Sequence, residues 1–110
     1  MSHSIGIWKP KHSIVVNDET YTFDKEELAT HGVTYNYGSI LWRVLGHGGI
    51  TKIYGLTGKE SIPILESAIA QLGDDVDLDY FVATEGNVKA DLCALLEIAK
   101  KYPYGTWDGD

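Results

Sequence analysis

The amino-acid sequence predicts a small α+β fold: an N-terminal antiparallel β-hairpin packed on two longer antiparallel helices, with short helical segments between them. The hairpin is indicated by residues 12–23, where an Asn-Asp pair separates two runs rich in β-branched and aromatic residues. The helices are indicated by residues 57–72 and 84–102, where apolar side chains recur every three or four positions. With 44% hydrophobic content, residues 1–110 are expected to form a single domain.

Two further segments belong to the N-terminal part of the chain. Residues 4–8 are apolar and favour an edge strand or a loose arm, because Pro10 lacks the amide hydrogen that an interior strand needs. After the hairpin, Asp24 and Glu27 have the spacing of a capping box. They predict a short helix over residues 25–31.

The middle of the chain predicts short elements. Residues 33–38 are expected to be extended or turn-like, and the apolar residues 39–45 form a helix. The glycine-rich segment 46–49 ends that helix, since glycine is favoured just past a helix C-terminus. Residues 50–56 then predict a short strand.

The first long helix has two candidate starts and one clear end. Thr57 with Glu60 makes a capping box, while Ser61 ahead of Pro63 offers a second start in the same place. Gly73 is the expected C-terminal stop.

The second long helix organises the rest of the core. Thr84 or Asn87 is its N-cap, and it stops before Pro103, after which the chain folds back as an aromatic tail. Residues 74–82, between the helices, are a strand or an ordered loop. The apolar stripes that should pack together are Val88, Leu92, Leu95, Ala99 and Tyr102 on one helix and Leu65, Ala68, Ile69 and Leu72 on the other.

The formal net charge of −7 is concentrated in the second half of the chain. Residues 1–58 hold five Lys/Arg and five Asp/Glu, whereas residues 59–110 hold four and eleven. Such a surface repels nucleic acids and anionic membranes, so the expected partner is a basic protein, unless the charge serves solubility alone. The single Cys93 and the lack of an N-terminal apolar stretch favour an intracellular, cytoplasmic protein.

The sequence contains no motif that predicts a catalytic residue, a cofactor or a metal. Asp75, Asp77 and Asp79 alternate as in a calcium loop, but the required glycine and the distal glutamate are replaced by Tyr80 and Gly86. Residues 55–61 have glycine and lysine but lack the first glycine of a phosphate-binding loop. We therefore expect a solvated acidic loop and a helix cap at these places.

Three sets of residues are candidates for binding. Tyr35, Asn36, Tyr37 and Trp42 form an aromatic and amide cluster, which suits an ordinary core or a recognition surface. His47, flanked by glycines, is either an exposed connector residue or a ligand contact. The acidic candidates for contact with a basic partner are Asp74, Asp75 and Asp77.

The order of the segments over residues 33–110 resembles a group of small proteins of unknown function that phages and other mobile elements encode. The similar segments are Tyr35-Asn36-Tyr37, the helix with Trp42, residues 56–69, Glu85-Gly86-Asn87, residues 95–103 and the tail with Trp107. Gly38 and Ser39 stand where these proteins often have a threonine-histidine-asparagine step. The resemblance implies an origin in a mobile element and implies no activity.

These observations favour a non-catalytic binding protein that engages a host protein through its acidic surface. One alternative is a small-molecule binding or sequestering protein that uses the aromatic cluster. Another is an enzyme whose residues are brought together only by the fold.

Overall fold

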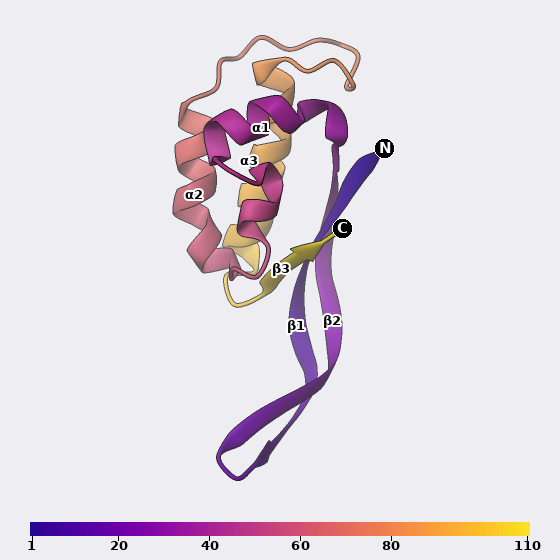
Figure 1. The fold of residues 1–110 in the computed structure, drawn as a ribbon, viewed down its shortest axis with the longest axis vertical. Helices are drawn as coiled ribbons and strands as arrows, with labels where there is room; N and C mark the ends of the chain where they lie inside the picture. The colour runs from indigo at the N-terminus through magenta and orange to yellow at the C-terminus, as the bar shows by residue number, and fades with distance from the viewer.

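The computed structural model describes residues 1–10, 15–21 and 25–110 with their side chains, and it confirms the α+β fold (Figure 1). A hairpin of β1 and β2 precedes a layer of helices, and a short C-terminal strand returns to the hairpin. In chain order the elements are β1 (Ser2–Val16), β2 (Glu19–Thr34), the 3-10 helix η1 (Tyr35–Tyr37), α1 (Gly38–Leu45), the 3-10 helix η2 (Gly49–Ile53), α2 (Gly58–Ala70), α3 (Glu85–Lys101) and β3 (Thr106–Gly109).

The three strands form one antiparallel sheet in the order β2-β1-β3. Asn17 and Asp18 make the hairpin turn, both with the positive φ angles (52° and 66°) that a tight two-residue hairpin turn requires. Residues 4–8 were expected at an edge or in a loose arm, and that expectation is wrong, because they form the centre of the sheet. Pro10 is tolerated since it lies beyond Trp8, the last residue of β1 that pairs with β3.

The helix expected over residues 25–31 is also wrong, since β2 runs through this segment. The segment pairs with β1, and its Leu28 and Ala29 pack against the core. A long strand partner and an apolar contact thus override a local capping signal. The pairing also changes register, because Ile7 faces Ala29 whereas Trp8 faces Glu27. Leu28 is therefore the extra residue of a β-bulge.

Helices α2 and α3 lie antiparallel, as expected. Thr57 is the N-cap of α2, and both bonds of its capping box with Glu60 are formed, at 3.1 and 2.9 Å. Thr84 is the N-cap of α3, accepting from the backbone nitrogen of Asn87 at 3.2 Å. Helix α2 ends at Ala70, three residues before the expected glycine.

Residues 50–56 do not form the expected strand, and most of them belong to η2. Gly48 and Gly49 adopt positive φ angles of 93° and 57°, which turn the chain sharply after α1. The following 3-10 turn then places Ile50 and Ile53, three positions apart, on the same buried side.

The core lies between the helices and one face of the sheet. Leu65, Leu92 and Leu95 are fully buried as predicted, whereas Ile69 is only partly buried at the margin. The aromatic tail becomes β3, and its Trp107 is fully buried. Inward-facing side chains of the sheet that join the core are Ile5, Ile7, Val33 and Trp107.

Candidate functional site

Residues 71–84 connect α2 to α3 as an ordered loop, which we call the α2–α3 loop (Figure 1). Of the two structures expected for residues 74–82, a strand or an ordered loop, the loop is observed. It carries the acidic candidates Asp74, Asp75 and Asp77, and it is held by other candidates from η1. The predicted aromatic cluster and the predicted acidic residues therefore meet here in part.

Asn87 anchors the loop from the first turn of α3. Its side chain is almost completely buried. Oδ1 accepts a hydrogen bond from the backbone nitrogen of Asp77 at 3.1 Å, and Nδ2 donates to the carbonyl oxygens of Asp79 and Val82 at 3.2 and 3.0 Å. One amide side chain thus satisfies three backbone groups of the loop and fixes its path.

Gly86 lets the loop lie directly on the start of α3. Its backbone nitrogen donates to the carbonyl oxygen of Asp75 at 3.0 Å. A Cβ atom at this position would lie 2.5 Å from the same oxygen, which is closer than real Cβ contacts. The sequence therefore needs glycine here for the loop to approach the helix.

Tyr80 ties the loop to the sheet and to α3. Its hydroxyl donates to Oδ2 of Asp91 at 2.7 Å and also approaches the carbonyl oxygen of Gly32 at 3.3 Å. Asp91 is buried, and its other oxygen Oδ1 lies 2.8 Å from Nε2 of His31. The buried carboxylate therefore has a partner on each oxygen, as a buried charge requires.

The candidates of η1 hold the loop from a third side. Nδ2 of Asn36 donates to the carbonyl oxygen of Phe81 at 3.0 Å, and the hydroxyl of Tyr37 donates to the carbonyl oxygen of Tyr80. The Tyr37 ring is fully buried and packs edge-on against the Tyr80 ring, with the centroids 5.4 Å apart. Tyr37 and Asn36 thus act in the structure as supports of the loop.

Two of the four aspartates in the loop bond its own backbone. Oδ1 of Asp77 accepts from the nitrogen of Asp79 at 2.8 Å, and Oδ1 of Asp79 accepts from the nitrogen of Phe81 at 3.0 Å. These are Asx turns, which stabilise a loop without a ligand. Asp74 pairs with Lys89 at 2.7 Å, and this hydrogen bond lowers the pKa of its carboxyl group.

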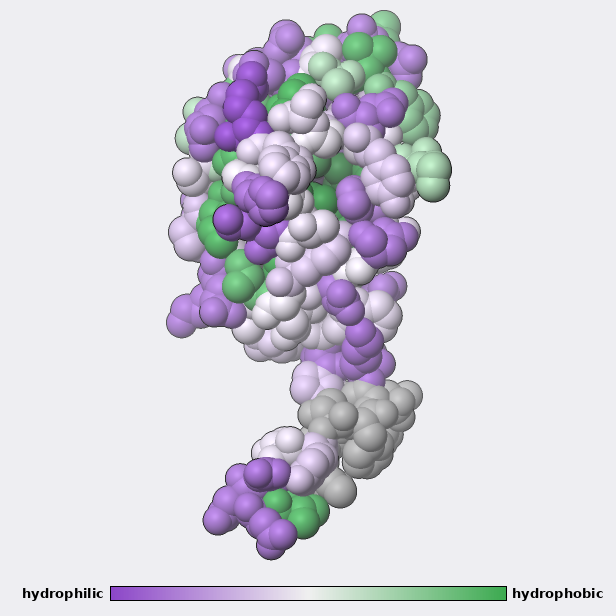
Figure 2. Space-filling model, viewed as in Figure 1, coloured by the Kyte–Doolittle hydropathy of each residue, from purple (hydrophilic) through white to green (hydrophobic). Residues whose placement is uncertain are grey.

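The outer side of the loop is apolar as well as acidic. Leu78 is fully exposed, and Val76, Phe81 and Val82 are 69%, 58% and 40% exposed. Figure 2 shows apolar residues, in green, at the upper end of the molecule, where the α2–α3 loop passes in Figure 1. A loop anchored by buried polar groups therefore presents apolar side chains beside carboxylates.

The supporting tyrosines have altered acidities. Burial, then the hydrogen bond to Asp91 and its charge, raises the pKa of the Tyr80 phenol. Burial, then the charge of Asp91, raises the pKa of Tyr37. Both phenols are thus held in the neutral form in which they donate their hydrogen bonds.

The remaining candidates lie elsewhere. Tyr35 is 43% exposed and packs edge-on against His3, with ring centroids 4.4 Å apart. Trp42 is half-exposed and packs edge-on against His47, at 4.5 Å. The structure thus divides the predicted aromatic cluster, because Tyr37 points into the core while Trp42 points out from α1.

Sequence reasoning missed several residues that build the loop. The sequence indicates Asn87 only as a possible helix cap, and it places His31 in a predicted short helix. Asp91 carried a usable signal, because it is an acidic residue one turn after Asn87 on the buried side of the helix. Nothing in the sequence indicated that Tyr80 would reach it.

The Asp91–His31 pair has the arrangement in which a carboxylate orients an imidazole for proton transfer. In the described part of the chain, no serine, threonine or cysteine side chain is hydrogen-bonded to His31. The same part of the chain has no group of three or more His, Cys, Asp or Glu side chains able to hold a metal ion. Its helices are also too short or too polar to cross a membrane. The pair's observed role is to hold Tyr80 and thereby the loop.

Comparison of the chain with protein-family models, curated proteins and solved structures finds no match. The α2–α3 loop is therefore described by its own geometry: an acidic and apolar surface on a fixed support.

Proposed function

We propose that this chain is a non-catalytic binding protein, and that its α2–α3 loop docks on a basic surface of a partner protein. The observation that carries the proposal is the contrast between the two sides of the loop. Its inner side is held by buried Asn87 and Asp91, whereas its outer side leaves Leu78 and Phe81 in water. Exposing apolar groups on a rigid support is unfavourable unless a partner covers them.

The charge of the loop selects the kind of partner. Asp75, Asp77 and Asp79 are exposed next to the apolar side chains, and in the described part of the chain none of them has a cationic partner. A partner with an apolar pocket rimmed by lysine or arginine would match both features. An anionic membrane would be repelled. The resemblance to mobile-element proteins makes a host protein the partner that we propose.

The test is affinity capture from a lysate of the host, followed by association kinetics with the retained protein. The double variant Asp75→Lys, Asp77→Lys should slow association, and the effect should shrink as salt rises, since long-range attraction acts mainly on the association rate. The double variant Leu78→Ser, Phe81→Ser should instead speed dissociation.

Matched controls place the same changes away from the loop. Glu66→Lys with Glu97→Lys changes the net charge equally at exposed sites on α2 and α3, and Tyr104→Ser removes an exposed aromatic ring in the C-terminal segment. These variants should bind as the wild type does. Equal effects of loop and control variants would reject the loop as the docking surface.

A further inference from the structure

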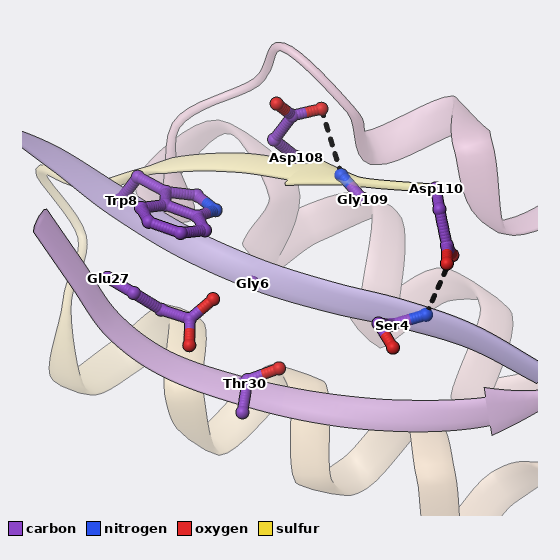
Figure 3. Close-up of a pocket in the computed structure, with 8 residues that line it drawn as sticks. All are labelled: Ser4, Gly6, Trp8, Glu27, Thr30, Asp108, Gly109 and Asp110. Carbon is purple, nitrogen blue, oxygen red and sulfur yellow. Dashed lines mark hydrogen bonds between the residues drawn. The ribbon is translucent and has the colours of Figure 1, made fainter. Parts of the chain in front are cut away.

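The face of the sheet opposite the helices carries a hollow with a volume of about 250 Å³. We call it the Trp8 pocket, and Figure 3 shows the side chains around it. All three strands contribute. It is lined by Ser4, Gly6 and Trp8 of β1, Glu27 and Thr30 of β2, and Asp108, Gly109 and Asp110 at the C-terminal end.

Gly6 forms the floor of the Trp8 pocket. A Cβ atom at Gly6 would lie 2.8 Å from Oε2 of Glu27 and 2.9 Å from Nε1 of Trp8. A carboxylate oxygen and an indole N–H therefore converge above this glycine, one able to accept and the other to donate a hydrogen bond. Any larger residue would fill the space between them.

The β-bulge at Leu28 places Glu27 in the Trp8 pocket. Gly6 faces Thr30 in the regular register, and without the bulge Trp8 would face Leu28. The bulge turns Leu28 toward the core and brings Glu27 opposite Trp8 instead. Bulges commonly re-aim one side chain at a functional site.

The Trp8 ring already binds one cation of the chain itself. Nζ of Lys25 lies 4.7 Å from the ring centroid and 3.2 Å from Oδ2 of Asp108. This contact lies beside a second hollow of about 300 Å³ that Trp8, Lys25 and Asp108 help to line. The arrangement of an aromatic face next to a carboxylate is therefore suited to a positive charge.

The Trp8 pocket itself contains carboxylates and no basic side chain among its lining residues. Oδ1 of Asp110 accepts from the nitrogen of Ser4 at 2.8 Å, and Oδ1 of Asp108 accepts from the nitrogen of Gly109 at 2.8 Å. Within the described residues, the Glu27 carboxylate has neither a hydrogen-bond partner nor an ion-pair partner. A charge facing the hollow is thus available to a ligand.

We propose that the Trp8 pocket binds a small organic cation with a guanidinium or primary ammonium group, held by the carboxylates of Glu27 and Asp108. The volume suits such a group better than a whole drug-sized molecule. The cation is either a free amine or guanidine, or the side chain of a basic peptide segment. The pocket shares no residue with the α2–α3 loop, so this proposal is independent of the one made for the loop.

The test is an NMR titration of the indole N–H signal of Trp8 with N-butylguanidinium, with the uncharged isostere N-butylurea as the matched ligand. We expect a saturable shift with the cation and none with the urea. A capped Gly-Arg-Gly peptide is titrated in parallel: tighter binding of the peptide assigns the pocket to a protein side chain, and tighter binding of the free cation assigns it to a small molecule.

Variants identify the carboxylate that binds the cation. Glu27→Gln should weaken binding by about tenfold or more, the scale of one charge-assisted hydrogen bond. Glu26→Gln is the matched control, since the neighbouring Glu26 pairs with Lys9 and does not line the pocket. Lys25→Met should tighten binding by freeing Asp108 and the Trp8 ring. An unsaturable shift, equal binding of N-butylurea, or equal effects of Glu27→Gln and Glu26→Gln would overturn the proposal.

Discussion

The indole nitrogen of Trp107 donates a hydrogen bond to the hydroxyl oxygen of Ser61, 2.8 Å away, in the closed core between β3 and α2. Both side chains are fully buried. Ser61→Ala should destabilise the fold by about 1–3 kcal/mol, because it leaves a buried N–H donor without a partner. Urea denaturation measures this loss. Ser67→Ala, at an exposed site of the same helix, is the control and should change stability by less than about 0.5 kcal/mol.

Tyr80 should give the protein an alkaline stability limit. Its folded-state pKa is raised, by burial first and then by Asp91, so its contribution to stability is complete below the unfolded pKa of about 10 and is lost as pH rises above it. The free energy of unfolding of the wild type and of Tyr80→Phe should therefore converge above about pH 10. Denaturant titrations across this range test it, with the exposed Tyr104→Phe as control. A constant difference between the wild type and Tyr80→Phe would contradict it.

Asn87→Ala should release the α2–α3 loop without unfolding the sheet. The backbone nitrogen of Asp77 loses its acceptor, and two carbonyl groups of the loop lose their donor. Hydrogen exchange at the Asp77 amide should accelerate strongly, whereas the amides of β1 that pair with β3 should keep their protection. Unchanged exchange at Asp77 would show that Asn87 does not fix the loop.

Leu95→Ala should destabilise the protein by about 2–5 kcal/mol, the range for a fully buried leucine. Leu78→Ala is the matched control, because Leu78 is fully exposed. It should change the free energy of unfolding by less than about 0.5 kcal/mol. A small effect of Leu95→Ala would mean that the α2–α3 packing contributes little.

Calcium should leave the melting temperature unchanged at millimolar concentration. Asp77 and Asp79 each already direct one carboxylate oxygen at the backbone of the loop. The loop also lacks the glycine and the bidentate glutamate of a calcium site. A melting scan with calcium and with a chelator tests this prediction, and a clear rise with calcium would assign these aspartates as ligands.

Local signals predicted the parts of the fold that depend on neighbours in sequence. The capping box of Thr57, the cap of Thr84 and the turn at Asn17 and Asp18 all follow from short-range hydrogen bonding or backbone preference. The buried leucines of α2 and α3 follow from helical spacing.

Strand pairings and side-chain contacts between residues distant in the chain could not be predicted from the sequence. The segment around Glu27 has a helical start signal, but its strand partner lies about twenty residues earlier in β1. Pro10 suggested an edge strand, because the sequence did not show that β3 pairs only with residues before it. For the candidate site, the acidic residues were visible, whereas the anchoring of Tyr80 on Asp91 required the folded arrangement.

The pairing of β3 with β1 joins one segment that is synthesised early with another that is synthesised late. Ser4 and Asp110, which share a hydrogen bond, are 106 positions apart. A nascent chain emerging from the ribosome therefore carries Ile7 long before its strand neighbour Trp107. Contacts between residues so distant in sequence form slowly, so we expect the core to be completed late in folding. Until then we expect the inner face of β1 to be accessible to chaperones and proteases. This exposure should shorten the lifetime of incomplete chains.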